Sequence, residues 1–139
     1  MRITALVLIA CLPFFGVARA AGDLVVISNA GSGVDKLTRD EAINIFMGRY
    51  KKLPSGISAL PVDESAEKAA FYRALLGKEL PEIQSYWARL VFSGQGSPPR
   101  QMDNASEVID AVANNKGAIG YVDRKKVNSR VKVVLELSP

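Results

Sequence analysis

The sequence predicts a single α/β domain in which helices pack on a mixed β-sheet. Residues 24–27 (Leu-Val-Val-Ile) form a nearly continuous apolar run, which is typical of a strand buried on both faces of a sheet. Later segments with apolar residues at helical spacing lie among short strand-like runs. The 139 residues suffice for one hydrophobic core and contain no recognisable repeat or linker. The predicted order is therefore β-α-β-α-α-α-β-β in one domain.

Residues 1–20 have the composition of a cleaved signal peptide. A basic start is followed by the apolar run 3–17 and by Ala-Arg-Ala at 18–20, so we expect cleavage before Ala21 and a folded domain over residues 21–139. The apolar run has about 15 residues, fewer than the roughly 20 that an ordinary membrane-spanning helix needs. These features predict a periplasmic protein that is not inserted in the membrane after signal cleavage.

A lipoprotein signal is the alternative interpretation of this leader, because residues 8–11 (Leu-Ile-Ala-Cys) imitate a lipobox. Cys11 lies close to the start, however, and the apolar run continues past it through Phe15, which favours the cleaved signal. Loss of Cys11 with the leader would leave no cysteine. Stability would then come from a packed core rather than from a disulfide.

The composition argues against several kinds of chemistry. The chain contains no histidine and one cysteine, which excludes Ser-His-Asp and Cys-His catalysis and His-ligated metal sites. No spacing among the acids, lysines and tyrosines suggests an acid, base or nucleophile, so the sequence predicts neither an enzyme nor a cofactor or metal. The formal net charge is +4, part of it in the leader. The short basic clusters at 51–52 and 124–126 are typical of solvated loop ends, so we expect no nucleic-acid partner, although a mild positive potential attracts small anions.

The first predicted helix has the clearest start. Thr38 and Glu41 are spaced as a capping box, in which each side chain accepts a hydrogen bond from the backbone amide of the other. Gly48 is placed to end the helix in a left-handed conformation. The apolar residues between them share one helical face and are Ala42, Ile45 and Phe46.

Two further helices are predicted after a second strand over residues 57–62. The first of them is predicted to start at Asp63, with Asp63 or Ser65 as its N-cap, and to end at Gly77. Pro81 suits the first turn of the next helix. That helix is predicted to bury one apolar stripe, formed by Ile83, Trp87, Leu90 and Val91.

Residues 93–103 are predicted to be a loop because glycines and a Pro-Pro pair interrupt any regular pattern. Asn104 is predicted to cap a fourth helix, and residues 118–122 a further strand. The fourth helix is predicted to bury Val108, Ile109 and Val112 and to stop at Gly117. The last strand is predicted to alternate between a buried and a solvated face, with its apolar positions at Val131, Val133, Leu135 and Leu137.

Two segments are candidate anion sites. In the loop 28–33 (Ser-Asn-Ala-Gly-Ser-Gly), successive small residues would let backbone amides point inward as an anion nest, with Asn29, Ser32 and Gly33 as ligands. We expect this loop at the carboxyl ends of strands, where open α/β sheets bind ligands. Ser65 lies at a predicted helix start, where free amides favour an anion. An ordinary connection in the first case, and N-capping in the second, are the alternative interpretations.

Four more side chains near the third helix could contact a ligand. Tyr86 and Trp87 could stack on one, but Trp87 lies on the apolar stripe, which favours a role in the core. Arg89 and Arg100 could clamp an oxyanion, whereas an exposed position or an ion pair is the alternative for both.

Several short sequence segments occur in order along most of residues 24–123. They are residues 26–29 followed by 37–38, then 45–49 (Ile-Phe-Met-Gly-Arg), 63–76, 86–94 with the Pro-Pro pair at 98–99, and 117–122 (Gly-Ala-Ile-Gly-Tyr-Val). Together they resemble the periplasmic phosphate-binding proteins that feed phosphate ABC importers. The resemblance implies a single periplasmic-binding-protein-like lobe, a mixed sheet flanked by helices. It also implies phosphate or a similar small oxyanion as ligand, and importer membrane subunits or another periplasmic protein as partner.

Two departures from this family bear on the ligand. Full phosphate receptors close two lobes over the anion, whereas residues 21–139 are expected to form one lobe. The family's arginine and Ser-Gly-Thr-like turn correspond here to Asp63, Glu64 and Ser65. Ser65 is then the remaining hydroxyl donor, and the two acids repel an anion.

The sequence therefore predicts a periplasmic solute-binding-like protein that binds phosphate or another oxyanion weakly through Asn29, Ser32, Gly33 and Ser65. The alternative is a single-lobe interaction module that has lost anion binding and docks on a protein partner. A large exposed apolar patch would favour the module, and a polar cleft lined by amides would favour the binding protein.

Overall fold

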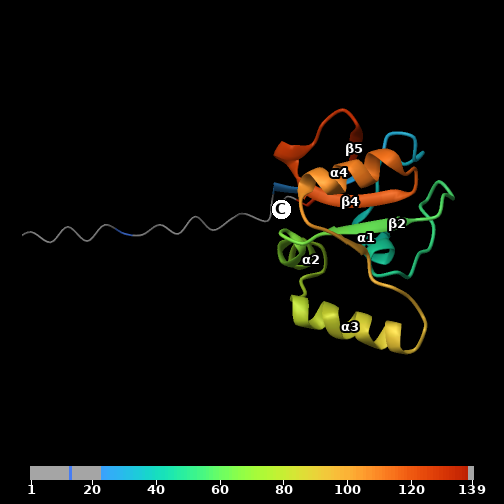
Figure 1. Cartoon of the computed structure of the whole chain (residues 1–139), viewed down its shortest axis with the longest axis vertical. Helices are drawn as coiled ribbons and strands as arrows, with labels where there is room; N and C mark the ends of the chain where they lie inside the picture. Colours follow the sequence, from blue (N-terminus) through green and yellow to red (C-terminus); the bar gives the residue numbers. More distant parts are fainter. Residues whose placement is uncertain (1–12, 14–22, 138–139) are drawn as a thin grey trace, which may run out of the picture.

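A computed structural model describes Pro13 and residues 23–137 of the chain. The predicted signal peptide and its cleavage site lie outside these residues, apart from Pro13. The regular elements follow one another as β1 (Leu24–Asn29), α1 (Arg39–Phe46), β2 (Leu60–Glu64), α2 (Lys68–Leu76), α3 (Leu80–Phe92), β3 (Arg100–Met102), α4 (Ala105–Asn114), β4 (Ala118–Asp123), the short 3₁₀ helix η2 (Arg124–Lys126) and β5 (Val131–Glu136). Figure 1 shows the strands in one sheet with helices on both sides.

The sheet is mixed, as predicted, and its strand directions decide where a site can form. Its order is β3-β2-β4-β1-β5. Strands β2, β3 and β4 run parallel to one another, whereas β1 runs antiparallel to its neighbours β4 and β5. Leu24, at the start of β1, pairs with Asp123, at the end of β4. The carboxyl end of β1 therefore lies at the opposite edge of the sheet from the carboxyl ends of β2, β3 and β4.

The two faces of the sheet carry different helices. Ile119 and Tyr121 of β4 point into a core shared with α1, α2 and α3, whereas Ala118 and Val122 point into a core shared with α4. This alternation is the period of two expected of a strand buried on both faces. In Figure 1, α4 crosses in front of β4, while α3 lies at the bottom of the view, away from the strands.

Several local predictions are confirmed. All six residues of β1 are buried. The Thr38 hydroxyl accepts from the Glu41 amide at 3.1 Å, and the Glu41 carboxylate accepts from the Thr38 amide at 3.0 Å, so the capping box forms as predicted. Gly48 and Gly77 have φ values of 73° and 67°, the left-handed conformation predicted for them. The Asn104 side chain caps α4 through the Glu107 amide, and the predicted apolar face of α4 is buried.

The boundary between β2 and α2 differs from the prediction. Asp63 and Glu64 are the last residues of β2, and α2 begins only at Lys68 with Glu67 as its N-cap. Neither Asp63 nor Ser65 caps the helix. The strand extends over the two acids because Asp63 has partners among the side chains packed on the sheet.

The predicted loop 93–103 contains a short strand. Residues Arg100–Met102 form β3, which pairs in parallel with Val62, Asp63 and Glu64 of β2. Arg100 and Gln101 are exposed and polar, so β3 has no apolar pattern of its own. It is a strand because β2 offers a free edge beside it.

Two burial predictions were wrong. In β5 the buried side chains are Val131 and Val134, whereas Val133 is half-buried. The pairing with β1 shifts between Val26 and Ile27, and a bulge of this kind breaks a strict alternation. On α3, Val91 is exposed rather than part of the buried stripe that Ile83 and Trp87 form.

Within residues 23–137 and at Pro13, no helix is long and apolar enough to cross a membrane.

Candidate functional site

A cavity of about 490 Å³ lies at the carboxyl edge of the parallel strands. Its walls come from three parts of the fold, namely the end of β2, the first turn of α4 and the connection between β4 and β5. Ligands of open α/β sheets bind outside the carboxyl ends of strands, so this cavity occupies the expected place for a ligand site. The polar residues among those lining it are Glu64, Asn104, Ser106, Asp110, Lys126, Asn128 and Arg130.

The first turn of α4 presents hydrogen-bond donors to this cavity. Asn104 caps the helix by accepting from the Glu107 amide at 3.0 Å. The preceding amides, those of Ala105 and Ser106, belong to the first turn, where helical N–H groups lack an intrahelical acceptor. The Ser106 side chain also lines the cavity and carries a hydroxyl. This wall suits an acceptor-rich ligand.

The connection between β4 and β5 brings positive charge to the same cavity. Lys126 ends η2, and Arg130 precedes β5. The Asn128 side chain accepts from the Arg130 amide at 3.0 Å, which shapes this turn. The Arg130 guanidinium donates to Asp110 of α4 at 2.6 Å, so part of its charge is already neutralised.

Negative charge in the cavity comes from the end of β2. Glu64 lines the cavity and is 6% exposed. Its neighbour Asp63 points to the other face of the sheet, because successive strand residues alternate. A bound anion would therefore meet one buried acid, Glu64, and would not touch Asp63.

Asp63 is held inside the core by four side chains. It is 1% exposed and accepts from the Tyr72 and Tyr121 hydroxyls at 2.8 and 2.9 Å and from the Gln101 amide at 3.0 Å. Lys68 lies 3.8 Å from its second oxygen. Burial raises the pKa of Asp63, and the hydrogen bonds from the tyrosines oppose this shift. Burial likewise raises the pKa of both tyrosines, so they remain protonated donors.

The loop after β1 does not form the predicted anion nest. Asn29 donates to the carbonyl oxygens of Val112 and Ala113 at 2.9 and 3.0 Å, which ties the loop to the end of α4. The amides of Gly31 and Ser32 donate back to Asn29, to its side chain at 2.7 Å and its carbonyl at 3.0 Å.

Ser32 is also engaged within this loop. It is buried, and its hydroxyl donates to Ser28 at 3.2 Å and accepts from the Val34 amide at 3.2 Å. Gly33 adopts φ 74°, which suits a turn. The Ser32 hydroxyl and the amides of Gly31 and Ser32 are therefore used inside the loop, and the Asn29 side chain is used by the end of α4, as in an ordinary connection.

The structure does not bring the four predicted ligand residues together. Asn29 ends β1, and Ser32 and Gly33 lie in the loop after it, whereas Ser65 follows β2. Because β1 and β2 run in opposite directions, Ser65 lies at the opposite edge of the sheet from the other three residues. Ser65 is exposed at the same edge as the cavity, and its amide donates to Met102 at 2.9 Å. The four residues thus form two separate groups in the fold, and anion binding by either group stays a prediction.

Sequence reasoning missed the residues that line the cavity opposite β2. Lys126 belongs to the basic cluster 124–126, which was interpreted as a solvated loop end, and Ser106 follows a cap that was predicted correctly. The sequence does not show that the connection after β4 lies beside the start of α4, so it could not place these two segments in one cavity. Four candidates near the third helix remain. Trp87 is buried in the core as expected, Tyr86 is half-buried, and Arg89 and Arg100 are exposed.

Comparison with solved structures identifies the fold. An ABC-type phosphate transport receptor from Vibrio cholerae matches with a TM-score of 0.63 and 17% identity over 81% of this chain and 45% of that chain. A putative phosphate ABC transporter substrate-binding protein with bound phosphate, from Clostridium perfringens, matches with a TM-score of 0.64 and 18% identity over 81% of this chain and 44% of that chain. A possible phosphate binding protein from Planctomyces limnophilus matches with a TM-score of 0.57 and 16% identity over 81% of this chain and 40% of that chain.

These matches define the class of fold: this is the α/β fold found in part of phosphate-binding proteins of ABC transporters. The chain spans less than half the length of the receptors it matches. No protein-family model matches the sequence, and no curated protein matches it. The predicted resemblance to phosphate importer binding proteins and the predicted fold class are both confirmed by the structural matches.

Proposed function

We propose that this protein is a solute-binding protein of the phosphate-importer type, and that it binds a small oxyanion such as phosphate weakly. The observation that carries the proposal is the cavity at the carboxyl edge of β2 and β4, which the first turn of α4, Lys126 and Arg130 surround. The same fold occurs in a protein crystallised with bound phosphate. The proposal makes the protein a carrier rather than an enzyme, and it places the protein in the periplasm after removal of residues 1–20.

The anion would be held by donors that the cavity already arranges. The amides of Ala105 and Ser106 lie in the positive end of the α4 dipole, and the Ser106 hydroxyl is beside them. Lys126 and Arg130 approach from the opposite wall. Ser65 lies at the same edge of the sheet and is a further candidate contact.

Weak binding follows from the acids in the same cavity. Glu64 and Asp110 offset the charges of Lys126 and Arg130, and Asp110 is in direct contact with Arg130. A like charge about 4 Å from the anion costs about 1 kcal/mol even in water, and more in a less polar site. We therefore expect a dissociation constant of about 1 mM, corresponding to about 4 kcal/mol of binding free energy.

Calorimetric titration of the purified protein with phosphate, and separately with sulfate, tests this proposal. Glu64→Gln removes one repulsive charge from the cavity, so phosphate should bind about fivefold more tightly, a gain of about 1 kcal/mol. Asp40→Asn is the matched control, because Asp40 is an exposed acid on α1, on the other face of the sheet. The affinity of Asp40→Asn for phosphate should equal that of the original protein.

Loss of a positively charged donor from the cavity should weaken phosphate binding. Lys126→Ala should weaken phosphate binding about fivefold, whereas Lys116→Ala, which removes an exposed lysine outside the cavity, should not. The absence of binding heat at millimolar phosphate for every variant would contradict the proposal. So would equal effects of the cavity variants and their controls.

A further inference from the structure

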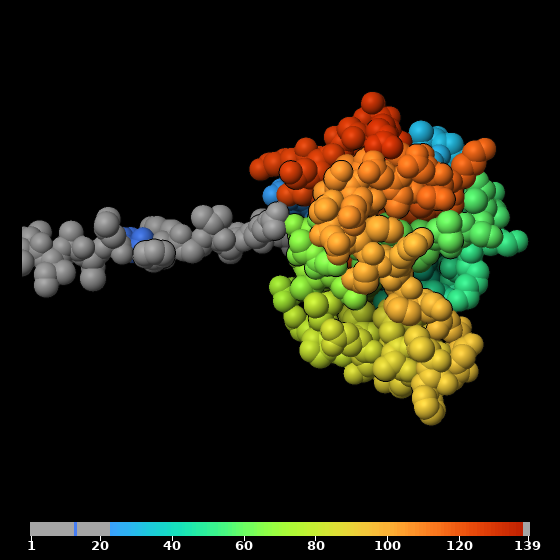
Figure 2. Space-filling view, in the orientation of Figure 1, coloured from blue at the N-terminus to red at the C-terminus, as the bar shows by residue number. Residues whose placement is uncertain are grey.

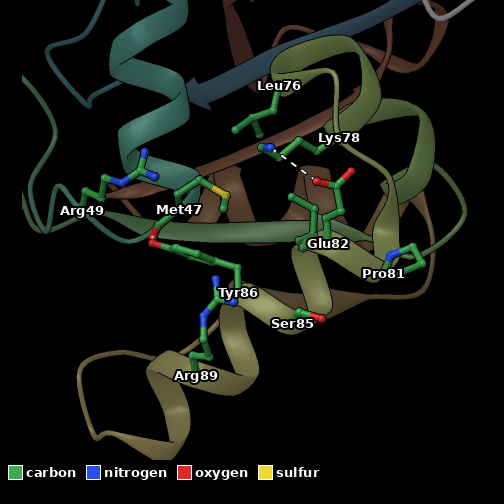
Figure 3. Close-up of a pocket in the computed structure, with 10 residues that line it drawn as sticks. Met47, Arg49, Leu76, Lys78, Pro81, Glu82, Ser85, Tyr86 and Arg89 are labelled. Atoms are coloured by element: carbon green, nitrogen blue, oxygen red, sulfur yellow. Dashed lines mark hydrogen bonds and ion pairs between the residues drawn. The ribbon is translucent and has the colours of Figure 1, made fainter.

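A second cavity lies on the other side of the molecule, outside the sheet. Its volume is about 430 Å³, and it lies between the end of α1, the turn from α2 to α3 and the outer side of α3. We call it the α3 groove. Its apolar floor includes Met47, Leu76, Ile83 and Tyr86. Figure 3 labels Met47, Leu76 and Tyr86 among the residues that line it.

Positive side chains surround this floor. Arg49, Lys78 and Arg89 all line the α3 groove and all are exposed. Among the described residues that line it, the one acid is Glu82, which pairs with Lys78 at 3.4 Å. Neither Arg49 nor Arg89 is in an ion pair within residues 23–137. The groove therefore keeps a net positive charge with two guanidinium groups available.

Tyr86 lies in the groove and contacts one of these two arginines, Arg49. Its hydroxyl donates to the carbonyl oxygen of Met47 at 2.7 Å, which anchors the ring across the groove. The Arg49 guanidinium lies over this ring at 5.9 Å from its centroid, a cation–π contact. In the view of Figure 3, Arg49 lies above Tyr86 and Arg89 below it. One planar donor, the Arg49 guanidinium, is thus held over the tyrosine ring, and Arg89 lines the same groove.

An exposed aromatic side chain continues this surface. Phe92 is 96% exposed and lies three residues after Arg89 on α3, so both side chains are on neighbouring turns of the same side of the helix. The adjacent Val91 is 54% exposed. The space-filling view shows α3 and the loop after it forming the lower end of the molecule (Figure 2). Phe92 and Val91 are neighbours, so they add exposed apolar surface next to the groove, and contiguous apolar surface of this kind is typical of interaction sites.

We propose that the α3 groove and Phe92 form a docking surface for an acidic segment of a protein partner. Carboxylates of the partner pair with Arg49 and Arg89, and an apolar side chain of the partner covers Phe92. Tyrosine, phenylalanine, methionine and arginine are the residues enriched in protein interfaces. Charge complementarity selects an acidic segment, since the groove is positive and guanidinium groups bind carboxylates in bidentate fashion.

A protein segment fits this surface better than a small anion does. The arginines lie at the rim of the groove and Phe92 lies outside it, one helical turn further along α3, so one ligand must extend beyond the cavity to reach both. The surface is also independent of the solute cavity. Helix α3 packs in the core on one face of the sheet, and the solute cavity is formed with α4 on the other.

The test is fluorescence anisotropy with a labelled peptide of alternating Glu and Leu residues, compared with a peptide of the same length in which Lys replaces Glu. We expect the protein to bind the acidic peptide at least about tenfold more tightly than the basic one, because only the acidic one complements the groove. Arg49→Glu combined with Arg89→Glu should weaken binding of the acidic peptide about tenfold or more. Phe92→Ser should weaken it about fivefold through loss of apolar contact.

The matched control combines Lys36→Glu with Lys116→Glu. Both lysines are exposed and lie outside the α3 groove, so the net charge changes equally while the groove stays intact. This control should retain affinity within about twofold. Circular dichroism confirms that each variant is folded, and phosphate titration of the arginine double variant should give the affinity of the original protein.

Three results would overturn the proposal. One is equal binding of the acidic and basic peptides. Another is an equal loss of affinity in the arginine variant and the lysine control, which would show a general charge effect. The third is binding to phosphatidylglycerol vesicles that depends on Arg49, Arg89 and Phe92 together with no binding of the acidic peptide, because this would assign the surface to a membrane.

Discussion

Tyr121 on β4 donates its hydroxyl to Oδ1 of Asp63 on β2 at 2.9 Å, which joins two neighbouring strands through their side chains. Tyr72 of α2 donates to the same oxygen at 2.8 Å, and Gln101 of β3 donates to the other oxygen at 3.0 Å. One carboxylate thus connects three strands and a helix. The Asp63 carboxylate is therefore engaged by side chains of the core.

Removal of the Asp63 carboxylate should destabilise the fold. Asp63→Ala leaves the buried hydroxyls of Tyr72 and Tyr121 without their acceptor, and each unsatisfied group costs about 1–3 kcal/mol. We expect a loss of about 2–4 kcal/mol in the free energy of unfolding. Urea denaturation followed by the fluorescence of Trp87, the single tryptophan of the chain, measures it.

Asp63→Asn is the conservative counterpart, because the amide keeps an oxygen that can accept from the tyrosines and loses the buried charge. Its stability at neutral pH should stay within about 1 kcal/mol of the original protein. If the alanine variant were as stable as the asparagine variant, the network would contribute nothing to folding.

The stability of the original protein and that of Asp63→Asn should depend differently on pH. Burial raises the pKa of Asp63 in the folded protein above its usual 3.8. Asp63 therefore stabilises the fold fully at a pH below its pKa in the unfolded protein. This stabilisation is lost as the pH rises through its pKa in the folded protein. The stability of Asp63→Asn relative to the original protein should rise between about pH 4 and pH 7. Urea denaturation of both proteins across this range tests the sign, and a relative stability that falls with pH would show that the folded pKa is lowered.

Gly48 makes a contact that no other residue type permits. It follows α1 with φ 73°, and a Cβ atom there would lie 2.8 Å from Cη2 of Trp87 on α3. Gly48→Ala should cost about 1 kcal/mol for the left-handed backbone and a further 1–3 kcal/mol, roughly, for the overlap with the indole.

Gly77→Ala separates these two contributions. Gly77 has φ 67° and nothing within 4 Å of an added Cβ, so only the backbone cost of about 1 kcal/mol applies. Thermal or urea denaturation of the two variants compares them. Equal losses would show that the indole moves aside without cost.

The elements that could be predicted from the sequence are those specified by nearby residues. The capping box at Thr38 and Glu41, the asparagine cap of α4 and the left-handed glycines at 48 and 77 depend on contacts within a few residues. The buried strand β1 was recognisable because residues 24–27 form a continuous apolar run. These features required no knowledge of the rest of the fold.

The elements that could not be predicted depend on residues far apart in the chain. The end of β2 resembles a helix start because Asp63 and Glu64 look like N-terminal acids. Contacts with residues far along the chain, such as Tyr121, 58 residues away, hold Asp63 in a strand. Strand β3 exists only because β2 offers a free edge. The sequence also could not show that Asn29 and Ser65 lie far apart, since this separation follows from the antiparallel direction of β1.

The measurement that most directly tests the central claim is a phosphate titration of the isotope-labelled protein followed by amide chemical shifts in NMR. The account predicts that the amides of Ala105 and Ser106, at the start of α4, and the turn at Ser65 shift with a common dissociation constant near about 1 mM. It also predicts that the amides of Gly31 and Ser32 stay unchanged. Shifts confined to the loop after β1, or no shifts at all, would contradict a solute site at the carboxyl edge of β2 and β4.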